Sequence, residues 1–161
     1  MPYEINVDGM REVAEMLDKL DKEAPRVASQ ALFEGAGIMA DTLKAAAEGI
    51  RTAPFRFARD GQTRLPSPEE KAIVLAASPG IAKFHKNGAE VDTSIGYRNA
   101  GYATLNGKMK PIPKIVNAIN SGTSFMPKQA FVRKAATSGG KKALQAMQDS
   151  MEKAFDEMTK E

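Results

Sequence analysis

Apolar residues at helical spacing run through most of the first fifty positions, and no other feature constrains the fold as strongly. A short strand is predicted over 3–7, and Asp8 then suits the N-cap of a first helix. The apolar stripe of that helix consists of Met10, Val13, Leu17 and Leu20. Pro25 interrupts the stripe and suits the first turn of a second helix, which is predicted from about 24 to 49.

The second predicted helix is unusually apolar, because its stripe widens until few positions remain for water. Gly35 and Gly37 lie inside it, although each glycine costs on the order of 1 kcal/mol relative to alanine. A tight crossing with another element explains them better than a flexible kink does. The helix is therefore predicted to be buried on more than one side, which for a chain of 161 residues suggests a neighbouring subunit.

The middle of the chain predicts a short helix and an antiparallel hairpin. Ser67-Pro68-Glu69-Glu70 has the N-cap, first-turn proline and returning glutamate of a capping box, so a helix is predicted to about 77. Segments 81–85 and 89–97 flank Asn87-Gly88, which is the strongest short-range hairpin signal.

The region from 101 onward predicts an irregular stretch and two more helices. Segment 101–113 is predicted to be irregular apart from a turn at Asn106-Gly107, and a short helix follows over about 114–120. The last helix is predicted to begin near Gln129 and to be weakened at Ser138-Gly139-Gly140. Its apolar stripe consists of Leu144, Met147, Met151, Ala154 and Met158.

These elements predict a single domain, 1–161, of the α+β class. Long N-terminal helices and a C-terminal helix are expected to pack on a small antiparallel sheet that contains the hairpin at about 81–97. An extended loop is expected at about 50–66, between the N-terminal helices and the rest of the domain.

The residue inventory argues against catalysis. The chain has no cysteine, which excludes disulfides, thiolate nucleophiles and thiolate metal sites. Its single histidine, His85, excludes histidine-pair metal sites and a histidine-based acid–base pair within one chain. No phosphate-binding loop or nucleophile elbow occurs. We therefore expect a protein that is not an enzyme and that holds no metal or cofactor.

The sequence also contains no membrane signal. No apolar run approaches the roughly 20 residues that span a bilayer. The N-terminus lacks a basic flank followed by an apolar segment. We expect a protein without a membrane contact, made and kept in the cytosol unless a larger assembly carries it elsewhere.

Charge is distributed unevenly along the chain, whose formal net charge is +3. Residues 1–50 carry ten acidic and five basic side chains, whereas residues 83–134 have a net charge of +7. Head-to-tail association of copies, or docking on an acidic partner, is therefore electrostatically favoured. Nucleic-acid binding is the second interpretation, although the basic residues are scattered singly and are not massed on one predicted helix face.

The predicted loop at 50–66 has no sustained period and contains two phenylalanines and four arginines. A loop of this length inside a compact domain is usually functional or mobile. One interpretation is a platform on which bases stack while arginines contact phosphates. The other is a subunit contact that inserts into a groove, and we favour it because an Arg-Phe pair is too short to specify nucleic acid. The residues concerned are Phe55, Arg56, Phe57 and Arg59.

The stretch 121–135, SGTSFMPKQAFVRKA, is predicted to be a docking turn that leads into the last helix. Gly122 can adopt a positive φ at little cost, and Pro127 removes a backbone donor. Phe125 and Phe131 supply large apolar anchors on either side of the bend. These residue types favour the positioning of a helix or a neighbour over catalysis.

The order of these features resembles the tail-component proteins of long-tailed bacteriophages, whose counterpart in lambda-like phages is the minor tail protein Z. The resemblance covers nearly the whole chain, from "DGMREVAEMLDKL" through "GIAKFHKNGAEVDTSIGY" to "NSGTSFMPKQAFVRKA" and the charged terminal helix. Its most specific part is 121–135, where the family pattern has Gly-Thr, a proline and an aromatic residue before the last helix.

The family pattern can be carried over to this sequence residue by residue. The positions that match its Gly-Thr, proline and aromatic residue are Gly122, Thr123, Pro127 and Phe131. Asn120 stands where an acidic residue is common, which puts the charge contact of that carboxylate in doubt. Ala130 stands where a proline often precedes the aromatic residue, which is expected to loosen the turn.

The resemblance implies a structural role in completing the tail, or in joining tail to head at the neck, of a phage or a resident prophage. It implies a non-catalytic subunit of a six-fold ring, located in the virion after assembly in the host cytoplasm. The implied partners are further copies and the phage's tail terminator, tail tube or head-closure proteins, with incidental DNA contact at most. Two alternatives stay open: a head-closure or tail-terminator protein of the adjacent layer, and a nucleic-acid-binding protein that uses the basic loop.

Overall fold

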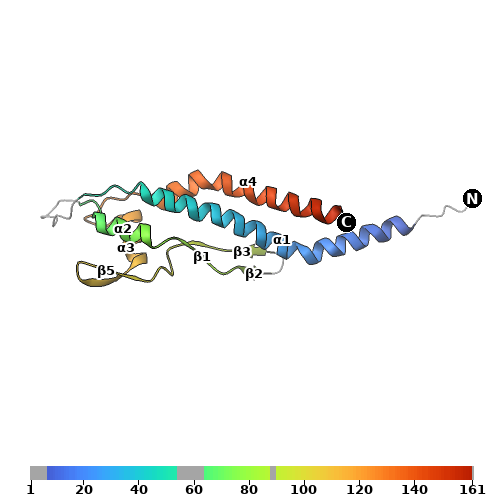
Figure 1. The fold of residues 1–161 in the computed structure, drawn as a ribbon, viewed down its shortest axis with the longest axis horizontal. Coiled ribbons are helices and arrows are strands. Elements are labelled where there is room, and N and C mark those ends of the chain that lie inside the picture. The colour runs from blue at the N-terminus through green and yellow to red at the C-terminus, as the bar shows by residue number, and fades with distance from the viewer. Residues whose placement is uncertain (1–6, 54–63, 88–89, 161) are drawn as a thin grey trace, which may run out of the picture.

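The computed structural model describes residues 7–53, 64–87 and 90–160, and it confirms the predicted α+β class. Figure 1 shows an elongated molecule in which two long helices run side by side, with the shorter helices gathered at one end. The helices are α1 (Val7–Glu48), α2 (Pro68–Ala76), α3 (Ile112–Ser121) and α4 (Phe131–Thr159). The strands are β1 (Gly80–Ile81), β2 (His85–Asn87), β3 (Glu90–Asp92), β4 (Ile95–Gly96), β5 (Tyr102–Leu105) and β6 (Lys108–Pro111).

α1 is one continuous helix, so the prediction of two N-terminal helices separated at Pro25 was wrong. The proline ring removes one backbone donor, but helical structure continues on both sides of it. Figure 1 shows the axis of α1 changing direction along its length, as expected of a long helix that contains a proline. Asp8 lies inside α1 and not at its N-cap, and the predicted strand over 3–7 lies almost entirely outside the described residues.

α1 and α4 pack closely because glycine stands at two of their contact points. A β-carbon on Gly35 would lie 2.7 Å from Cγ of Met147, and one on Gly139 would lie 2.7 Å from Oγ1 of Thr42. The tight crossing predicted at Gly35 is confirmed, whereas a β-carbon on Gly37 would meet nothing within 4 Å. Glycine lowers the intrinsic stability of a helix, but α4 continues through Gly139 without interruption because its packing against α1 supports the backbone there.

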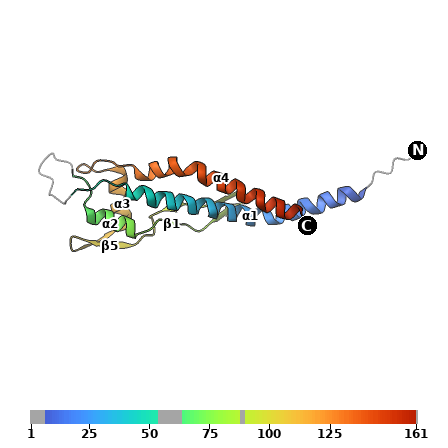
Figure 2. The same ribbon diagram turned by 45° about the horizontal axis from the view of Figure 1, so that its top comes forward.

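The apolarity of α1 beyond residue 24 is explained by neighbours within the same chain. α4 covers one side of α1, while α2 and the strands β1, β3 and β4 lie against another (Figures 1 and 2). The ring of Phe33 on α1 meets that of Phe84 edge to face, with centroids 6.5 Å apart. Burial on more than one side is thus confirmed, and it arises without a neighbouring subunit.

The predicted hairpin at 81–97 is confirmed as two short antiparallel ladders, and we call it the first hairpin. β1 pairs with β4 through Ile81 and Ile95, and β2 pairs with β3 through His85 and Asp92. Three residues on the first strand therefore oppose two on the second, which is the count of a β-bulge. Within this bulge the N–H of Ala82 donates to the Ser94 oxygen at 2.8 Å.

A second hairpin occupies 102–111, where an irregular stretch was predicted. β5 pairs with β6 from Tyr102 opposite Pro111 to Leu105 opposite Lys108. Asn106 has φ 53° and Gly107 has φ 73°, so both central residues of the loop have the positive φ that a two-residue hairpin turn requires. The turn was predicted correctly, and the strands were missed because each is only four residues long and β6 ends in a proline.

The hydrophobic core lies where the C-terminal part of α1 meets α2, α3 and the start of α4. The buried residues of this cluster include Leu43, Ala47, Ile50, Val74, Tyr97, Leu105, Ile112, Ile115, Val116, Ile119, Met126, Phe131 and Ala135. α2 begins with the predicted capping box, in which Ser67 Oγ accepts from the Glu70 N–H and the Glu70 carboxylate accepts from the Ser67 N–H. This end of the molecule positions the turn between α3 and α4.

Candidate functional site

The turn that joins α3 to α4, residues 121–130, is closely packed on itself at Gly122. This residue is the C-cap of α3 with φ 78° and ψ 171°, a backbone conformation that is essentially restricted to glycine. A β-carbon there would lie 2.9 Å from the Met126 oxygen and 2.9 Å from the Lys128 nitrogen. The predicted positive φ at Gly122 is confirmed, and the close approach of 126–128 is a second reason for glycine.

Thr123 closes the turn through its main chain and its side chain. Its N–H donates to the Met126 oxygen at 2.9 Å, and its Oγ1 accepts from the Met126 N–H at 3.1 Å. The N–H of Phe125 also donates to this Oγ1, at 3.4 Å. The hydroxyl oxygen is therefore engaged by backbone donors of the turn, which gives Thr123 a structural role.

The two phenylalanines of the docking turn have different surroundings. Phe131, the first residue of α4, is 2% exposed, and its ring lies 6.5 Å from that of Tyr97 between centroids. Phe125 is 45% exposed and lies beneath the Arg64 guanidinium, whose carbon is 5.7 Å from the ring centroid. Met126, which the sequence analysis did not single out, is buried in the core. Phe131 thus anchors the core, while Phe125 presents its ring at the surface.

Gln129, just before α4, links the turn to the segment that follows α1. Its buried side chain accepts from the Arg51 N–H at 2.8 Å and donates to the Arg51 oxygen at 2.9 Å. Its own N–H donates to the Ile119 oxygen at 3.1 Å. No local sequence pattern predicts the role of Gln129, because its partner lies 78 residues away in the chain. Pro127, two residues earlier, is partly buried.

Asn120 and Ala130, the two positions that differ from the pattern of the tail-component proteins, both make hydrogen bonds that stabilise the turn. Asn120 Oδ1 accepts from the Val132 N–H at 3.1 Å, so α3 supplies a cap to the first turn of α4. An aspartate there could accept the same bond and would add a favourable charge at a helix N-terminus. The N–H of Ala130 donates to the Asn120 oxygen at 2.9 Å, and its φ is 49°. Proline has no N–H and a fixed negative φ, so the expectation that Ala130 loosens the turn was wrong.

A partly buried ion pair connects the turn to the start of α2. Arg64 makes two bonds of 2.9 Å to the Glu70 carboxylate, and its backbone N–H donates to the Phe125 oxygen at 2.6 Å. Burial alone would raise the pKa of Glu70, but the hydrogen bonds from Arg64 and the Ser67 N–H hold that pKa below its ordinary value of 4.5. Glu70 is therefore ionised at neutral pH and fixes the Arg64 guanidinium beside the Phe125 ring.

The predicted subunit-contact residues of the loop, Phe55, Arg56, Phe57 and Arg59, lie outside the described residues. The two flanks of that segment are joined to each other, because the N–H of Ala53 donates to the Pro66 oxygen at 3.0 Å. Each flank is also tied to the docking turn, one through Arg51 and Gln129 and the other through Arg64.

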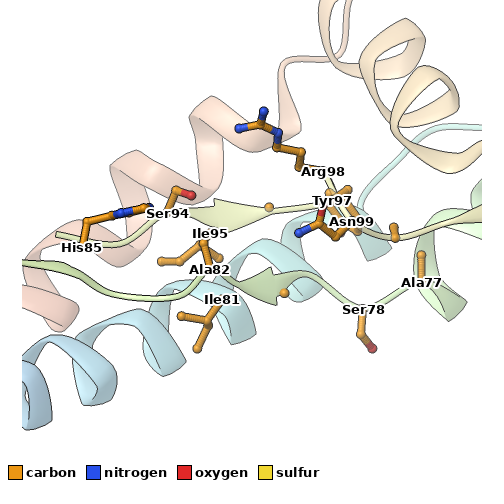
Figure 3. Close-up of a pocket in the computed structure, with 13 residues that line it drawn as sticks. Ala77, Ser78, Ile81, Ala82, His85, Ser94, Ile95, Tyr97, Arg98 and Asn99 are labelled. Carbon is orange, nitrogen blue, oxygen red and sulfur yellow. The ribbon is translucent and has the colours of Figure 1, made fainter.

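An open groove of ≈ 670 Å³ lies along the first hairpin, next to the end of α2 (Figure 3). The polar side chains that line it include His85, Ser94, Arg98 and Asn99, and no carboxylate is among its lining residues. The Tyr97 hydroxyl is buried without a hydrogen-bond partner among the described residues, and burial raises its pKa.

Replacing Gly122 with alanine is expected to lower the free energy of unfolding by about 1–3 kcal/mol, because the side chain forces a glycine-only conformation against backbone atoms. Urea unfolding followed by circular dichroism measures this. Gly37→Ala is the matched control, since its β-carbon meets nothing and it is expected to stabilise α1 by up to about 1 kcal/mol. A Gly122→Ala variant as stable as the wild type would contradict the turn geometry.

The described residues contain neither a grouped set of metal-binding side chains nor a membrane-spanning helix. Across 7–53, 64–87 and 90–160, no three His, Asp or Glu side chains are grouped so that they could hold a metal ion. Within that part of the chain, no helix combines the length and the apolarity needed to cross a bilayer. No family model matches the chain, and searches of curated proteins and of solved structures likewise found no match.

Proposed function

We propose that this protein is a structural subunit of a long-tailed bacteriophage or prophage that completes the tail or joins the tail to the head at the neck. In this proposal it acts without catalysis, as one copy in a six-fold ring. The ring contacts the tail tube, tail terminator or head-closure protein. The subunit assembles in the host cytoplasm and then remains in the virion.

The observation that carries this proposal is the construction of the turn between α3 and α4. Gly122, Thr123 and Phe131, which match the phage pattern, respectively permit the bend, close it and anchor it in the core. The side-chain bonds of Asn120 and Gln129 go to backbone groups of the same chain. The matched residues therefore build a joint between helices, which suits a structural subunit better than a catalytic site.

Exposed apolar side chains on the two long helices support a role in protein contacts. Val13, Leu17 and Phe33 on α1 are exposed, and so are Leu144 and Phe155 on α4. Val13 and Leu17 lie one helical turn apart on α1, and adjacent exposed apolar side chains of this kind are typical of regions that another protein covers. This feature favours an assembly subunit over a protein that acts alone.

Nucleic-acid binding is the second candidate, and one feature of the chain favours it. Residues 93–148 contain nine Lys and Arg side chains and no Asp or Glu. Such an excess of positive charge attracts phosphate groups, but it suits an acidic protein surface equally well. Binding measurements are needed to separate the two.

Native mass spectrometry and sedimentation of the full chain test the proposal, both alone and with the tail tube protein of the same phage or prophage. The expected result is a discrete ring, or an oligomer that forms with the tube protein. The opposite outcome is a monomer under all these conditions that binds duplex DNA, with an affinity that falls steeply between about 50 and 200 mM salt. That outcome would replace the structural proposal with the nucleic-acid alternative.

A further inference from the structure

The N-terminal part of α1 carries an uncovered apolar face. Figures 1 and 2 both show α1 extending past the end of α4 and away from the rest of the molecule. We call residues 13–24 the arm. Val13 is 57% exposed and Leu17 is 60% exposed. The base of the arm lies beside the last turns of α4, where Glu23 and Met158 line one hollow.

The apolar face of the arm continues the seam by which α1 packs against its own chain. Val27 and Ala31 are buried, and Leu20, Leu17 and Val13 follow toward the N-terminus at helical steps of three, four or seven. Leu20 is partly buried, and exposure increases where α4 ends. The arm thus presents the same kind of surface as the buried seam, without a covering element from the described part of its own chain.

Charge decides which surface fits the arm. The arm carries four acidic and two basic side chains, so the pairing of two arms would bring like charges together. By contrast, the segment 93–148 has no acidic residue, and it includes all of α3 and the first part of α4. A second copy therefore offers a complementary surface at this basic segment and not at its own arm.

An apolar groove of ≈ 500 Å³ lies in this basic region, between the end of the first hairpin, α3 and the start of α4. The apolar side chains that line it include those of Leu43, Ile95, Tyr97, Pro113, Val116 and Val132. Arg98 and Lys114 also line the groove and are exposed, and no carboxylate is among the lining residues. Figure 3 shows Arg98 extending outward from the end of the hairpin.

We infer that the arm of one copy docks in this groove of a second copy, with Val13 and Leu17 against the apolar lining and the acidic side chains near Arg98 and Lys114. The inference rests on the self-association in the proposed function and names its contact surface. Figure 1 shows the arm pointing away from the body of its own chain, so a second copy has access to it. Such a contact uses two different surfaces, so repetition closes a ring or extends a filament.

Two double variants and their mixture test this contact. The arm variant is Val13→Gln/Leu17→Gln, and the groove variant is Arg98→Glu/Lys114→Glu. All four side chains are exposed, so both variants are expected to keep the wild-type circular dichroism spectrum. Each variant alone is expected to self-associate roughly tenfold more weakly or worse, measured by sedimentation velocity of the full chain. Met109→Gln, at a residue 76% exposed on the second hairpin, is the control and should associate as the wild type does.

The mixture separates this contact from other modes of association. An equimolar mixture is expected to form dimers, because the intact arm of the groove variant fits the intact groove of the arm variant. If the arm variant associates normally, or if the mixture stays monomeric, the docking inference is wrong while self-association stands. If the wild type itself is monomeric at all concentrations and salt conditions, self-association and the proposed ring fail together.

Discussion

Phe131→Ala is expected to lower the free energy of unfolding by about 3–5 kcal/mol, enough to unfold much of the isolated protein near physiological temperature. Phe131 is buried at the first position of α4, where its ring packs edge to face on Tyr97. Truncation removes apolar contact and leaves a cavity between α4 and the first hairpin, because the surrounding backbone relaxes only partly. Urea unfolding monitored by far-ultraviolet circular dichroism gives the value.

Phe125→Ala is the matched control for that measurement. Phe125 lies six residues earlier and is 45% exposed, so its truncation is expected to change stability by less than about 1 kcal/mol. Equal losses in the two variants would mean that Phe131 is not the anchor of this core. A Phe131→Ala chain that is stable as a monomer but fails to assemble would instead identify Phe131 as an interface residue.

Arg64→Ala is expected to have the second largest effect, a loss of about 2–3 kcal/mol at neutral pH. Removing one partner of a fully buried ion pair costs roughly 3–5 kcal/mol, and the partial exposure of Arg64 reduces that figure. The variant leaves the buried Glu70 carboxylate hydrogen-bonded to the Ser67 N–H and without its guanidinium partner, and it removes the cation above Phe125. Thermal unfolding of the Arg64→Ala variant and of the wild type measures this loss of stability.

An exposed ion pair on α1 provides the control for Arg64. Lys22 binds Asp18 at 2.7 Å one helical turn apart on α1, and both side chains are largely exposed. Lys22→Ala is therefore expected to leave the thermal unfolding curve nearly unchanged. Similar losses for Lys22→Ala and Arg64→Ala would show that burial does not strengthen the Arg64 pair.

The same ion pair predicts how stability depends on pH. The folded chain holds the pKa of Glu70 below its ordinary value of 4.5, so the unfolded chain binds the proton more readily as pH falls. The contribution of Glu70 to stability is thus complete above about pH 5 and is lost as pH drops from there through the lowered pKa. Glu70→Gln removes this part of the acid dependence, and an unchanged acid-unfolding profile in that variant would contradict the assignment.

Elements that depend on neighbours in sequence were predictable from the chain alone. The capping box at Ser67 and the turn at Asn106 and Gly107 both form as predicted, because each is completed within four residues. The break predicted at Pro25 was wrong for the opposite reason. A proline weakens a helix locally, but α1 continues through Pro25, and α4, which is distant in sequence, packs along α1.

The docking turn likewise contains some features that were predictable from the sequence and others that were not. The sequence identified Gly122 and Phe131 from local chemistry and Thr123 through the resemblance to the tail-component pattern, and the structure gives each a defined place. It did not identify the clamp between Gln129 and Arg51, nor the pairing of Arg64 with Glu70 beside Phe125. These contacts join segments that meet only after the chain has folded.

The sequence by itself determined the class of the fold, the start of α2, the turn at Asn106 and Gly107, and the acidic and basic segments, because these depend on residue type and short spacing. Only the tertiary structure decided which apolar faces are covered. It places α4 and the strands against one part of α1 and leaves the arm uncovered beyond the end of α4. Burial is a property of elements brought together from distant parts of the chain, so no local pattern distinguishes the buried part of that seam from the exposed one.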